Sequence, residues 1–270
     1  MSFMYNPFPF DDPKPVNRPE LSEKTVSSIV GGGIPNVAKK FAAPIIEKAR
    51  KKNQVVAFDG YTTVDWTVFL NLLARECAAA GIEFESVDAN AECFKSGKEI
   101  DAMIDPMLIW DKKIDPTLLY GKIYKGGYEG MLDEEKTQAF EKKVSALGEG
   151  AGKVVAVFGY GVLIPRFRAL YDTKCFFDIT PKTSILRIRR GEYVNIGKKR
   201  PDIINRVIRR CYYCDFEMAV CSRRELLRNN VPDFWFLSDD PQNIQMLPYE
   251  AFADICAQLV KYPFRAKPCY

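Results

Sequence analysis

Two short apolar runs, each followed at once by a glycine turn, constrain this chain more than any other feature. Residues 54–58 run into Asp59-Gly60-Tyr61, and a helical pattern follows over residues 65–81. Residues 154–158 run into Gly159-Tyr160-Gly161. A strand that is apolar at consecutive positions is buried on both faces, as in the parallel sheets of βαβ units. The pattern therefore predicts an α/β fold.

Further elements extend this alternation. We expect additional strands over residues 82–87, 175–179 and 233–237. We expect helices over residues 20–30, 34–52, 133–147, 215–229 and 248–260, and a helix that starts at Thr180-Pro181. Strands that alternate with helices favour a three-layer α/β fold with a parallel sheet.

The chain of 270 residues divides at residue 52 in this prediction. Residues 1–52 form a proline-rich extended arm followed by helices, which Gly31-Gly32-Gly33 interrupts. Residues 53–270 form the α/β domain.

Histidine is absent, which excludes a Ser-His-Asp triad, histidine acid–base catalysis and metal sites that need imidazole. Eight cysteines without a secretion signal predict reduced thiols and a cytoplasmic location. No apolar run approaches the roughly 18–20 residues that cross a bilayer, so we expect no membrane partner.

The charges are unevenly distributed. The net charge of the chain is +4, whereas residues 187–210 hold nine Lys and Arg against Glu192 and Asp202. A short basic island on a mildly acidic body favours a phosphate-bearing small molecule over a nucleic acid, which usually needs a broader basic face. The alternative is a solvated basic helix and loop.

The turn after residue 58 partly matches a phosphate-binding loop, which has Gly, four residues and then Gly-Lys-Ser/Thr. Gly60 matches the first glycine and Thr67 the final hydroxyl, but Asp65 and Trp66 replace the second glycine and the lysine. The helix N-terminus would still offer backbone amides to a phosphate. The alternative is that Asp65 or Thr63 caps the helix. The candidate ligand-binding residues of this loop are Gly60, Tyr61, Thr62, Thr63 and Thr67.

Residues 152–193 have the sequence GKVVAVFGYGVLIPRFRALYDTKCFFDITPKTSILRIRRGEY, and this stretch resembles the uridine kinase and phosphoribulokinase group of P-loop kinases. Gly159 matches the glycine after a strand of that group, and Phe158 stands in the place of its glutamate. Residues 172–178 follow the next strand pattern, and Asp88 occupies the place of an acidic residue near the acceptor hydroxyl. The resemblance implies a P-loop nucleoside-kinase type of fold. It also implies a phosphate-binding lid that contains Arg187, Arg189 and Arg190.

Four motifs carry a closer resemblance: VVAFDGYTTVDW, CFKSGKEIDAMIDP, RRGEYVNIG and RRCYYCDFE. They resemble the kinase-like domain N-terminal to the isomerase in some bacterial class I mannose-6-phosphate isomerases. That domain also has Phe-Asp-Gly-Tyr and Val-Asp-Trp in place of a working phosphate loop. The isomerase itself is a cupin whose zinc ligands include histidines. Because this chain has no histidine, we expect the kinase-like part without isomerase activity.

Cys211 and Cys214 form a CxxC motif, and Cys221 follows it. A structural zinc site needs four ligands, and the chain offers no second pair and no histidine. A redox CxxC would open a helix after the first strand of its domain. We therefore expect buried free thiols and no zinc, and we expect Asp215 to cap the next helix.

These observations predict a P-loop kinase-like protein with a degenerate phosphate loop. It would bind a nucleotide or a phosphorylated small molecule, a sugar phosphate or a nucleoside, under an arginine-rich lid that turns at Asn195 and Gly197. If phosphoryl transfer is retained, ATP and Mg²⁺ are the expected cofactors, and Asp59 or Asp88 is the base or Mg²⁺ ligand. The missing lysine and glutamate argue against full kinase activity.

The alternative function is a non-catalytic scaffold or assembly protein that keeps the kinase fold. Its N-terminal arm, which contains Tyr5, Phe8 and Phe10, would then dock on a protein partner or on a second copy of the chain.

Overall fold

The computed structural model describes residues 20–117 and 120–261. The strands are β1 (Gln54–Gly60), β2 (Glu83–Asp88), β3 (Lys153–Phe158), β4 (Thr173–Asp178), β5 (Phe234–Leu237) and β6 (Gln245–Pro248). The α-helices are α1 (Glu23–Ser28), α2 (Ile34–Ala49), α3 (Thr67–Ala79), α4 (Ala89–Cys93), α5 (Gly97–Ile104), α6 (Glu134–Leu147), α7 (Pro181–Arg189), α8 (Ile204–Arg210), α9 (Phe216–Arg228) and α10 (Tyr249–Leu259). The arm residues Tyr5, Phe8 and Phe10 lie outside the described residues.

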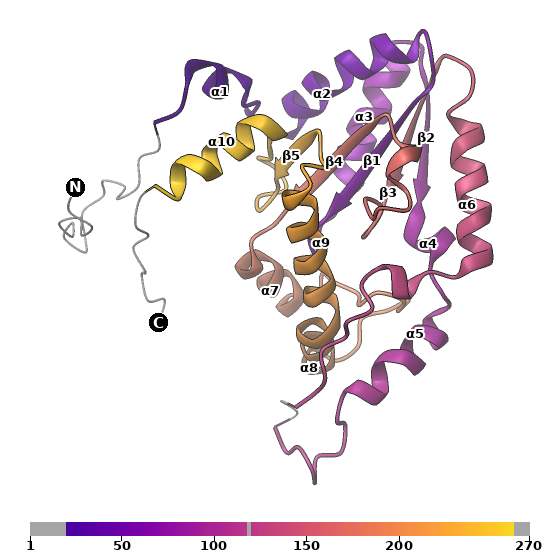
Figure 1. Cartoon of the computed structure of the whole chain (residues 1–270), viewed down its shortest axis with the longest axis vertical. Coiled ribbons are helices and arrows are strands. Elements are labelled where there is room, and N and C mark those ends of the chain that lie inside the picture. The colour runs from indigo at the N-terminus through magenta and orange to yellow at the C-terminus, as the bar shows by residue number, and fades with distance from the viewer. Residues whose placement is uncertain (1–19, 118–119, 262–270) are drawn as a thin grey trace, which may run out of the picture.

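The strands form one sheet in the order β2-β3-β1-β4-β5-β6 (Figure 1). The first five strands are parallel, and β6 is antiparallel to β5. The predicted three-layer α/β fold is therefore confirmed. The sheet is mixed rather than wholly parallel, because β6 runs antiparallel to β5. The sequence pattern does not predict this strand. This edge strand has only four residues and ends in a proline, which an edge position tolerates.

One face of the sheet packs against α2 and α3. Phe58, Phe177 and Phe236 point to this face, where they surround Phe41 of α2 and Phe69 of α3. The rings of Phe177 and Phe236 are stacked, with centroids 4.3 Å apart. Helix α2 precedes the predicted boundary at residue 52 and contributes buried side chains to the same core as the sheet.

The opposite face is covered by other helices. Because successive strand residues alternate in direction, Phe176 and Trp235 point away from α2 and α3. Phe252 of α10 stacks on Trp235 with centroids 4.4 Å apart. Helix α9 crosses in front of the sheet in Figure 1, while α3 lies behind it. Because β1 to β5 run parallel, their carboxyl ends lie at one edge of the sheet.

Helices α8 and α9 are joined without a break by a π-helical turn, Cys211–Asp215. Asp215 has helical backbone angles, φ −64° and ψ −42°, and its side chain caps no backbone amide among the described residues. The prediction that Asp215 is a helix N-cap was therefore wrong. The helix passes through this residue, so its carboxyl lies inside the protein.

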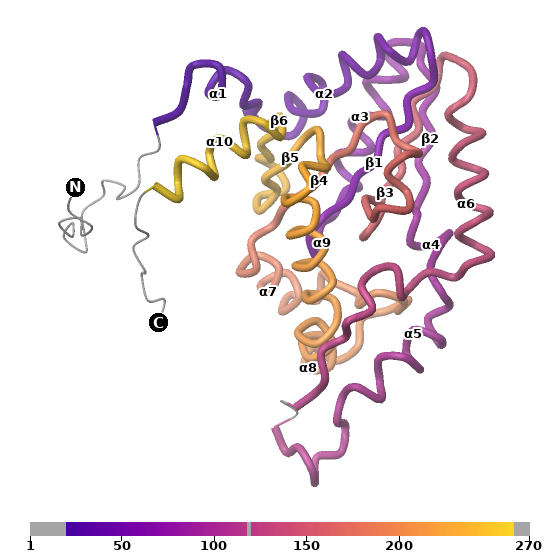
Figure 2. The backbone as a smooth tube through the Cα atoms, viewed as in Figure 1, coloured from indigo at the N-terminus to yellow at the C-terminus, as the bar shows by residue number. Residues whose placement is uncertain are grey.

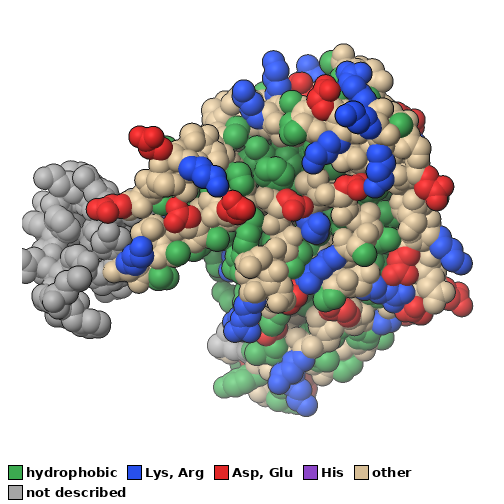
Figure 3. Space-filling view, turned by 45° about the horizontal axis from the view of Figure 1, so that its top comes forward, with side chains coloured by type: hydrophobic (Ala, Val, Ile, Leu, Met, Phe, Trp, Pro, Cys, Tyr) green, Lys and Arg blue, Asp and Glu red, His purple; other side chains and the backbone are tan. Residues whose placement is uncertain are grey.

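The tube in Figure 2 shows α5 beside α8 at one end of the molecule. Two ion pairs join these regions, because Asp101 of α5 lies 2.7 Å from Arg210 and 2.5 Å from Lys198. On the face shown in Figure 3, basic and acidic side chains are interspersed. Within residues 20–117 and 120–261, no helix has both the length and the apolar character to cross a membrane.

Candidate ligand site at the carboxyl edge of the sheet

The candidate phosphate loop connects β1 to α3 and begins at a crowded glycine. A Cβ on Gly60 would lie 2.9 Å from Val64 Cγ2 and 3.1 Å from the carbonyl oxygen of Phe177. The first contact is shorter than real Cβ atoms show and the second is unusually tight, so the packing favours glycine at this position. The chain thus turns away from β1 under tight packing, with the loop folded against the neighbouring strand β4.

Backbone amides of the loop are bonded within the protein. Tyr61 N donates to Phe177 O at 2.9 Å, and Thr63 N donates to the hydroxyl of Tyr160 at 3.1 Å. In a phosphate loop, such N–H groups point toward phosphate oxygens. These two are already occupied by oxygen atoms of the protein.

The start of α3 is capped by its own loop. Thr67 N donates to Asp65 Oδ1 at 2.8 Å, and Val64 N donates to Tyr61 O at 3.1 Å. Asp65 therefore bonds the first amide of the helix from one position before the N-cap, which is Trp66 and has no side-chain cap bond, and its carboxylate complements the positive end of the helix dipole. A phosphate at this position would face that carboxylate at close range.

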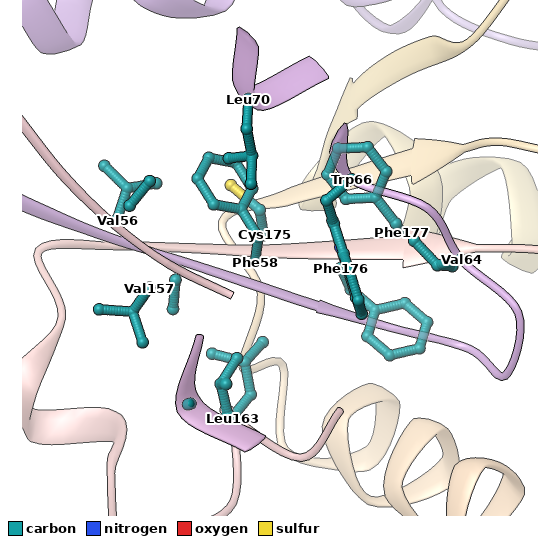
Figure 4. Close-up of a cluster of buried hydrophobic side chains, with 14 of the residues drawn as sticks. Val56, Phe58, Val64, Trp66, Leu70, Val157, Leu163, Cys175, Phe176 and Phe177 are labelled. Atoms are coloured by element: carbon teal, nitrogen blue, oxygen red, sulfur yellow. The ribbon is translucent and has the colours of Figure 1, made fainter. Parts of the chain in front are cut away.

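Trp66 fills the place expected for the loop lysine. Its side chain is only 7% exposed and packs against Phe158 and Tyr160, with ring centroids 6.0 Å and 5.2 Å away. Figure 4 shows Trp66 and Val64 gathered with core side chains of the strands. The indole N–H has no hydrogen-bond partner among the described residues.

Thr63 adopts a backbone conformation that is unusual for its type. Its φ of 78° lies in the left-handed region, which a β-branched residue rarely adopts. Ser184 of α7 supports it, because Ser184 Oγ lies 3.2 Å from Thr63 Oγ1 and donates to Thr62 O at 2.8 Å. The surrounding protein thus holds the loop in a strained shape.

Tyr61 and Thr62 turn toward α9. The ring of Tyr61 stacks on Phe216 with centroids 6.3 Å apart, and the Arg223 guanidinium lies 4.6 Å from the Tyr61 centroid. Thr62 Oγ1 donates to Asp215 O at 3.2 Å. Both side chains are buried and join the loop to this helix.

Arg187 of α7 supports the loop from the opposite side to Tyr160. Its guanidinium, only 7% exposed, donates to Thr63 O at 2.9 Å and to Ser238 O and Asp239 O, each at 3.2 Å. These bonds connect the loop to the segment after β5. They contrast with the phosphate-facing position expected for a lid arginine.

The other two predicted lid arginines are exposed. Arg190 pairs with Glu192, with Nε 2.5 Å from Oε1. This pair holds the pKa of the Glu192 carboxyl below its ordinary value. Arg189 is exposed at the end of α7. The structure therefore separates the three arginines, with Arg187 inside the fold and the other two at the surface.

Asp59 is fully buried beneath the loop. Its carboxylate accepts hydrogen bonds from Gly60 N at 2.7 Å, Gly161 N at 3.0 Å and Leu163 N at 2.9 Å. Burial raises its pKa from 3.8 to about 6, although the three N–H bonds lower it. The carboxylate connects β1 to the turn after β3, and a catalytic role for it stays a prediction.

Asp88 lies elsewhere on the same edge. It is exposed at the end of β2 and caps α4 by accepting a hydrogen bond from Ala91 N at 3.1 Å. Strand β3 separates β2 from β1, so Asp88 and Asp59 belong to strands that are not neighbours. Its predicted role in phosphoryl transfer also stays a prediction.

A cavity of about 440 Å³, here called the loop cavity, lies against the loop and the start of α3. Two predicted loop residues, Thr63 and Thr67, reach it. It is lined by Thr63, Val64, Asp65, Trp66, Thr67, Leu70, Asn71, Ser86, Phe158, Tyr160, Glu192, Tyr193 and Val194. Its charged lining residues are the carboxylates of Asp65 and Glu192.

A buried polar network lies behind this cavity. Asp215 Oδ2 accepts hydrogen bonds from the Tyr193 hydroxyl at 2.9 Å and from Asn195 Nδ2 at 2.7 Å. Burial raises the pKa of Asp215 above its ordinary value, and the charge of Arg210 opposes this shift. Asn195 was expected at a mobile turn, but it is buried and anchored by this network.

The CxxC cysteines border the same network. Cys211 and Cys214 are buried free thiols, as predicted, and burial raises the pKa of both. In the part of the chain that the structure describes, no group of three metal-ligating side chains has the geometry of a metal site.

Sequence reasoning missed several residues that shape the site. Tyr160 and Ser184 hold the loop, yet only the glycines around Tyr160 suggested a turn. Asp101, inside a motif that carried the family resemblance, pairs with Lys198 and Arg210 of residues 187–210, here called the basic segment. Trp110 lies under two arginines of that segment, and no sequence signal marked it.

Comparison with solved structures finds similarity in fold. A protein assigned as a fructose transport system kinase from Silicibacter sp. TM1040 is 16% identical, with a TM-score of 0.46, covering 69% of this chain and 94% of that chain. A protein assigned as a uridine kinase from Bacillus stearothermophilus is 10% identical, with a TM-score of 0.44, covering 74% and 97%. Both scores are too low to carry an argument about ligand or activity.

No curated protein matches this chain. The resemblance to the domain beside mannose-6-phosphate isomerases stays a prediction. A family model described as "Domain of unknown function (DUF8485)" matches residues 37–261, from within α2 to just beyond the end of α10. This match covers the sheet, the loop and the basic segment, and the chain therefore belongs to the DUF8485 family.

Proposed function

We propose that this chain is a kinase-like binding protein that takes an uncharged, hydroxyl-bearing small molecule, a nucleoside or a sugar, in the loop cavity. It does not transfer phosphate. One observation carries the proposal: the loop amides and Arg187 bond to the protein itself, while the charged lining of the neighbouring cavity is Asp65 and Glu192, the latter paired with Arg190. No Lys or Arg belongs to the described residues that line it.

The lining suits a ligand with hydroxyl groups. The carboxylates of Asp65 and Glu192 accept hydrogen bonds from hydroxyls, and Asn71 both donates and accepts. The Trp66 indole N–H, which lacks a partner among the described residues, supplies a donor for a ligand oxygen. Aromatic side chains form the apolar wall. The volume of about 440 Å³ falls within the usual range for small-molecule sites.

The same lining opposes a phosphate. A phosphate near Asp65 would meet a like charge, and the neutral indole of Trp66 replaces the ammonium that would neutralise it. The protein would also need to break its own bonds at Thr63 to free amides or Arg187. These costs oppose phosphoryl transfer more than they oppose binding of an uncharged molecule.

The test compares each uncharged compound with its phosphate. Calorimetric titration of the protein with uridine, fructose and mannose, and with their monophosphates, should give saturable binding for one uncharged compound. Its phosphate should bind at least about tenfold more weakly. With ATP and Mg²⁺ present, no phosphorylated product should form. Tighter binding of the phosphate, or product formation, would overturn the proposal.

Two variants locate the binding. Asp65→Asn keeps an oxygen that can accept from Thr67 N but removes the charge, and Trp66→Phe keeps an aromatic ring but removes the N–H donor. Each should weaken binding about tenfold. Asp88→Asn, an exposed helix cap outside the cavity lining, is the matched control and should leave the affinity unchanged. An equal loss in the control would place the ligand elsewhere.

A second candidate function, assembly, is favoured by exposed apolar residues. Ile114 is 68% exposed and Ile203 is 64% exposed. Ile114 precedes Asp115, and Asp115 pairs with Arg209 of α8, the helix that follows Ile203. If this surface binds a second copy, wild-type protein should be a dimer by light scattering. The double variant Ile114→Ser with Ile203→Ser should then be a monomer.

A further inference from the structure

A second cavity, of about 200 Å³, lies where the basic segment meets α5 and the chain that follows it. We call it the basic-segment cavity. Its lining is Asp105, Trp110, Asn195, Lys198, Asp202, Arg206 and Arg210. The segment 193–195 separates it from the loop cavity, because Tyr193 and Val194 line the first cavity and Asn195 lines the second.

The charges of this cavity differ from those of the loop cavity. Three cationic side chains line it, against the two carboxylates of Asp105 and Asp202. Asp202 lies 3.7 Å from Arg206 with both side chains well exposed, and such a surface pair is weak. Asp202 therefore competes only weakly with a ligand for Arg206.

Arg210 is the most buried cation of this cavity, with only 3% of its surface exposed. It donates to Asp101 Oδ1 at 2.7 Å and to Ile196 O at 2.6 Å, but its Nε–H has no partner among the described residues. This Nε atom is itself buried, so the Arg210 guanidinium contributes its positive charge to the cavity while that N–H stays inside the protein. Guanidinium groups bind phosphate oxygens well because their N–H groups are directed in a plane.

Trp110, which lines the cavity, lies against the guanidinium groups of two arginines. The guanidinium carbons of Arg206 and Arg209 lie 5.4 Å and 4.7 Å from the centroid of its ring. Such cation–π contacts restrict the guanidinium groups, so less entropy is lost when an anion binds. The ring also supplies an apolar wall for a short carbon chain.

We infer that the basic-segment cavity binds the phosphate group of a small molecule, with Lys198 and Arg206 as donors and the buried guanidinium of Arg210 as a further positive charge beside them. The inference is independent of the uncharged ligand proposed for the loop cavity. A volume of about 200 Å³ accommodates a phosphate and a few carbon atoms, so the ligand class is free phosphate or a small phosphomonoester. Asp101 competes with the ligand, because it pairs with both Lys198 and Arg210.

The experiment is a calorimetric titration with inorganic phosphate and with glycerol 3-phosphate, at an ionic strength held constant with sodium chloride. We expect saturable binding with a dissociation constant on the order of 1 mM or below. Tighter binding of glycerol 3-phosphate identifies a phosphomonoester, and equal affinity identifies free phosphate. Glycerol, the uncharged control, should not bind.

Neighbouring residues provide matched variants. Lys198→Gln and Arg206→Gln should each weaken phosphate binding about tenfold, whereas Lys199→Gln and Arg200→Gln, exposed cations outside the lining, should change it less than about twofold. Asp101→Asn should strengthen binding, since it removes the competing carboxylate. Thermal unfolding checks that each variant is folded, and the exposed Arg206 keeps the test valid if Lys198→Gln is unstable.

Two results would overturn the inference. Equal weakening by the lining and control variants would mean that a diffuse field attracts the anion. The absence of saturable binding in both wild type and Asp101→Asn would mean that the cavity does not bind phosphate.

Discussion

The loop between β1 and α3 and the basic segment differ in what their hydrogen-bond donors do. In the loop, Thr63 N donates to the hydroxyl of Tyr160, and Arg187, the first residue of the basic segment, donates to the loop carbonyl Thr63 O. In the basic segment, Arg210 keeps an N–H that no described residue accepts. A donor that already has a partner binds an anion only if that bond breaks. A partial match to the motif therefore does not by itself give a loop whose amides are free to hold phosphate.

Nearby carboxylates strengthen this contrast. Asp65 stands in the loop itself and bonds the first amide of α3, whereas Asp101 reaches the basic segment from another helix. The first carboxylate is part of the local turn. The second belongs to an ion pair that a ligand can rearrange. Removing Asp101 should therefore help an anion to bind, whereas removing Asp65 does not free the loop amides that bond to Phe177 and Tyr160.

The largest effect is expected for Arg187→Ala. The substitution leaves two buried carbonyl groups and one half-buried carbonyl group without a charged donor, so the free energy of unfolding should fall by about 4 kcal/mol. Urea unfolding measures this change. Arg189→Ala, an exposed neighbour on the same helix, should stay within about 0.5 kcal/mol of wild type. If both variants unfold alike, Arg187 is free to act as a lid residue and the contrast with the basic segment is lost.

A pH-dependent effect is expected for Asp59, whose folded-state pKa is raised from 3.8 to about 6. The folded protein then holds this proton more tightly than the unfolded chain does. The resulting stabilisation is complete below about pH 4 and is lost as the pH rises through about 6. A shift of about two units corresponds to about 3 kcal/mol.

Asp59→Asn provides the reference for this measurement. The free energy of unfolding of wild type, relative to the variant, should fall by about 3 kcal/mol between pH 4 and pH 7. A constant difference across this range would mean that the carboxyl ionises freely. That result would contradict the raised pKa of Asp59 in the folded protein.

A smaller effect is expected for Ser184→Ala. The variant loses the hydrogen bond to Thr62 O and the contact with Thr63 Oγ1, so the unfolding free energy should fall by about 1–2 kcal/mol. Ser27→Ala, at an exposed helix position, serves as the control for urea unfolding. A neutral Ser184→Ala would show that Thr63 keeps its left-handed conformation without this support.

The smallest effect is expected for the stability of Trp66→Phe. The substitution keeps an aromatic ring in the core and removes an N–H that has no partner among the described residues. The removal of this unsatisfied N–H partly offsets the cost of the smaller ring. The change in unfolding free energy should therefore be about 1 kcal/mol or less. A much larger loss would indicate a partner for the indole N–H.

Much of the fold can be predicted from local sequence. Residues 54–58 predict β1 because five apolar or amide residues in a row suit a strand buried on both faces. The break at Gly31-Gly32-Gly33 is confirmed, since α1 ends at Ser28 and α2 begins at Ile34, with Gly33 at a φ of 89°. The antiparallel β6 was not predicted, because Gln245–Pro248 lacks the continuous apolar run that marks the equally short β5.

The candidate site is less predictable. Asp65 accepts a hydrogen bond from the amide of Thr67, only two residues away, and local sequence can suggest such a short-range contact. The helical position of Asp215 does not, because a π turn continues the helix through a residue type that usually caps one. The burial of Arg187 also escaped prediction, because a charge run usually indicates a solvated surface.

The sequence by itself determined the five parallel strands and the longer helices, the glycine at position 60 and the absence of imidazole chemistry. Only the tertiary structure decided which donors remain available. Thr63 bonds to Tyr160 across 97 residues of chain, and Arg187 bonds to Thr63 across 124. Arg210 finds Asp101 across 109 residues. Periodicity is a local property that sequence displays directly, whereas hydrogen bonds and ion pairs depend on distances that arise only when remote segments pack together.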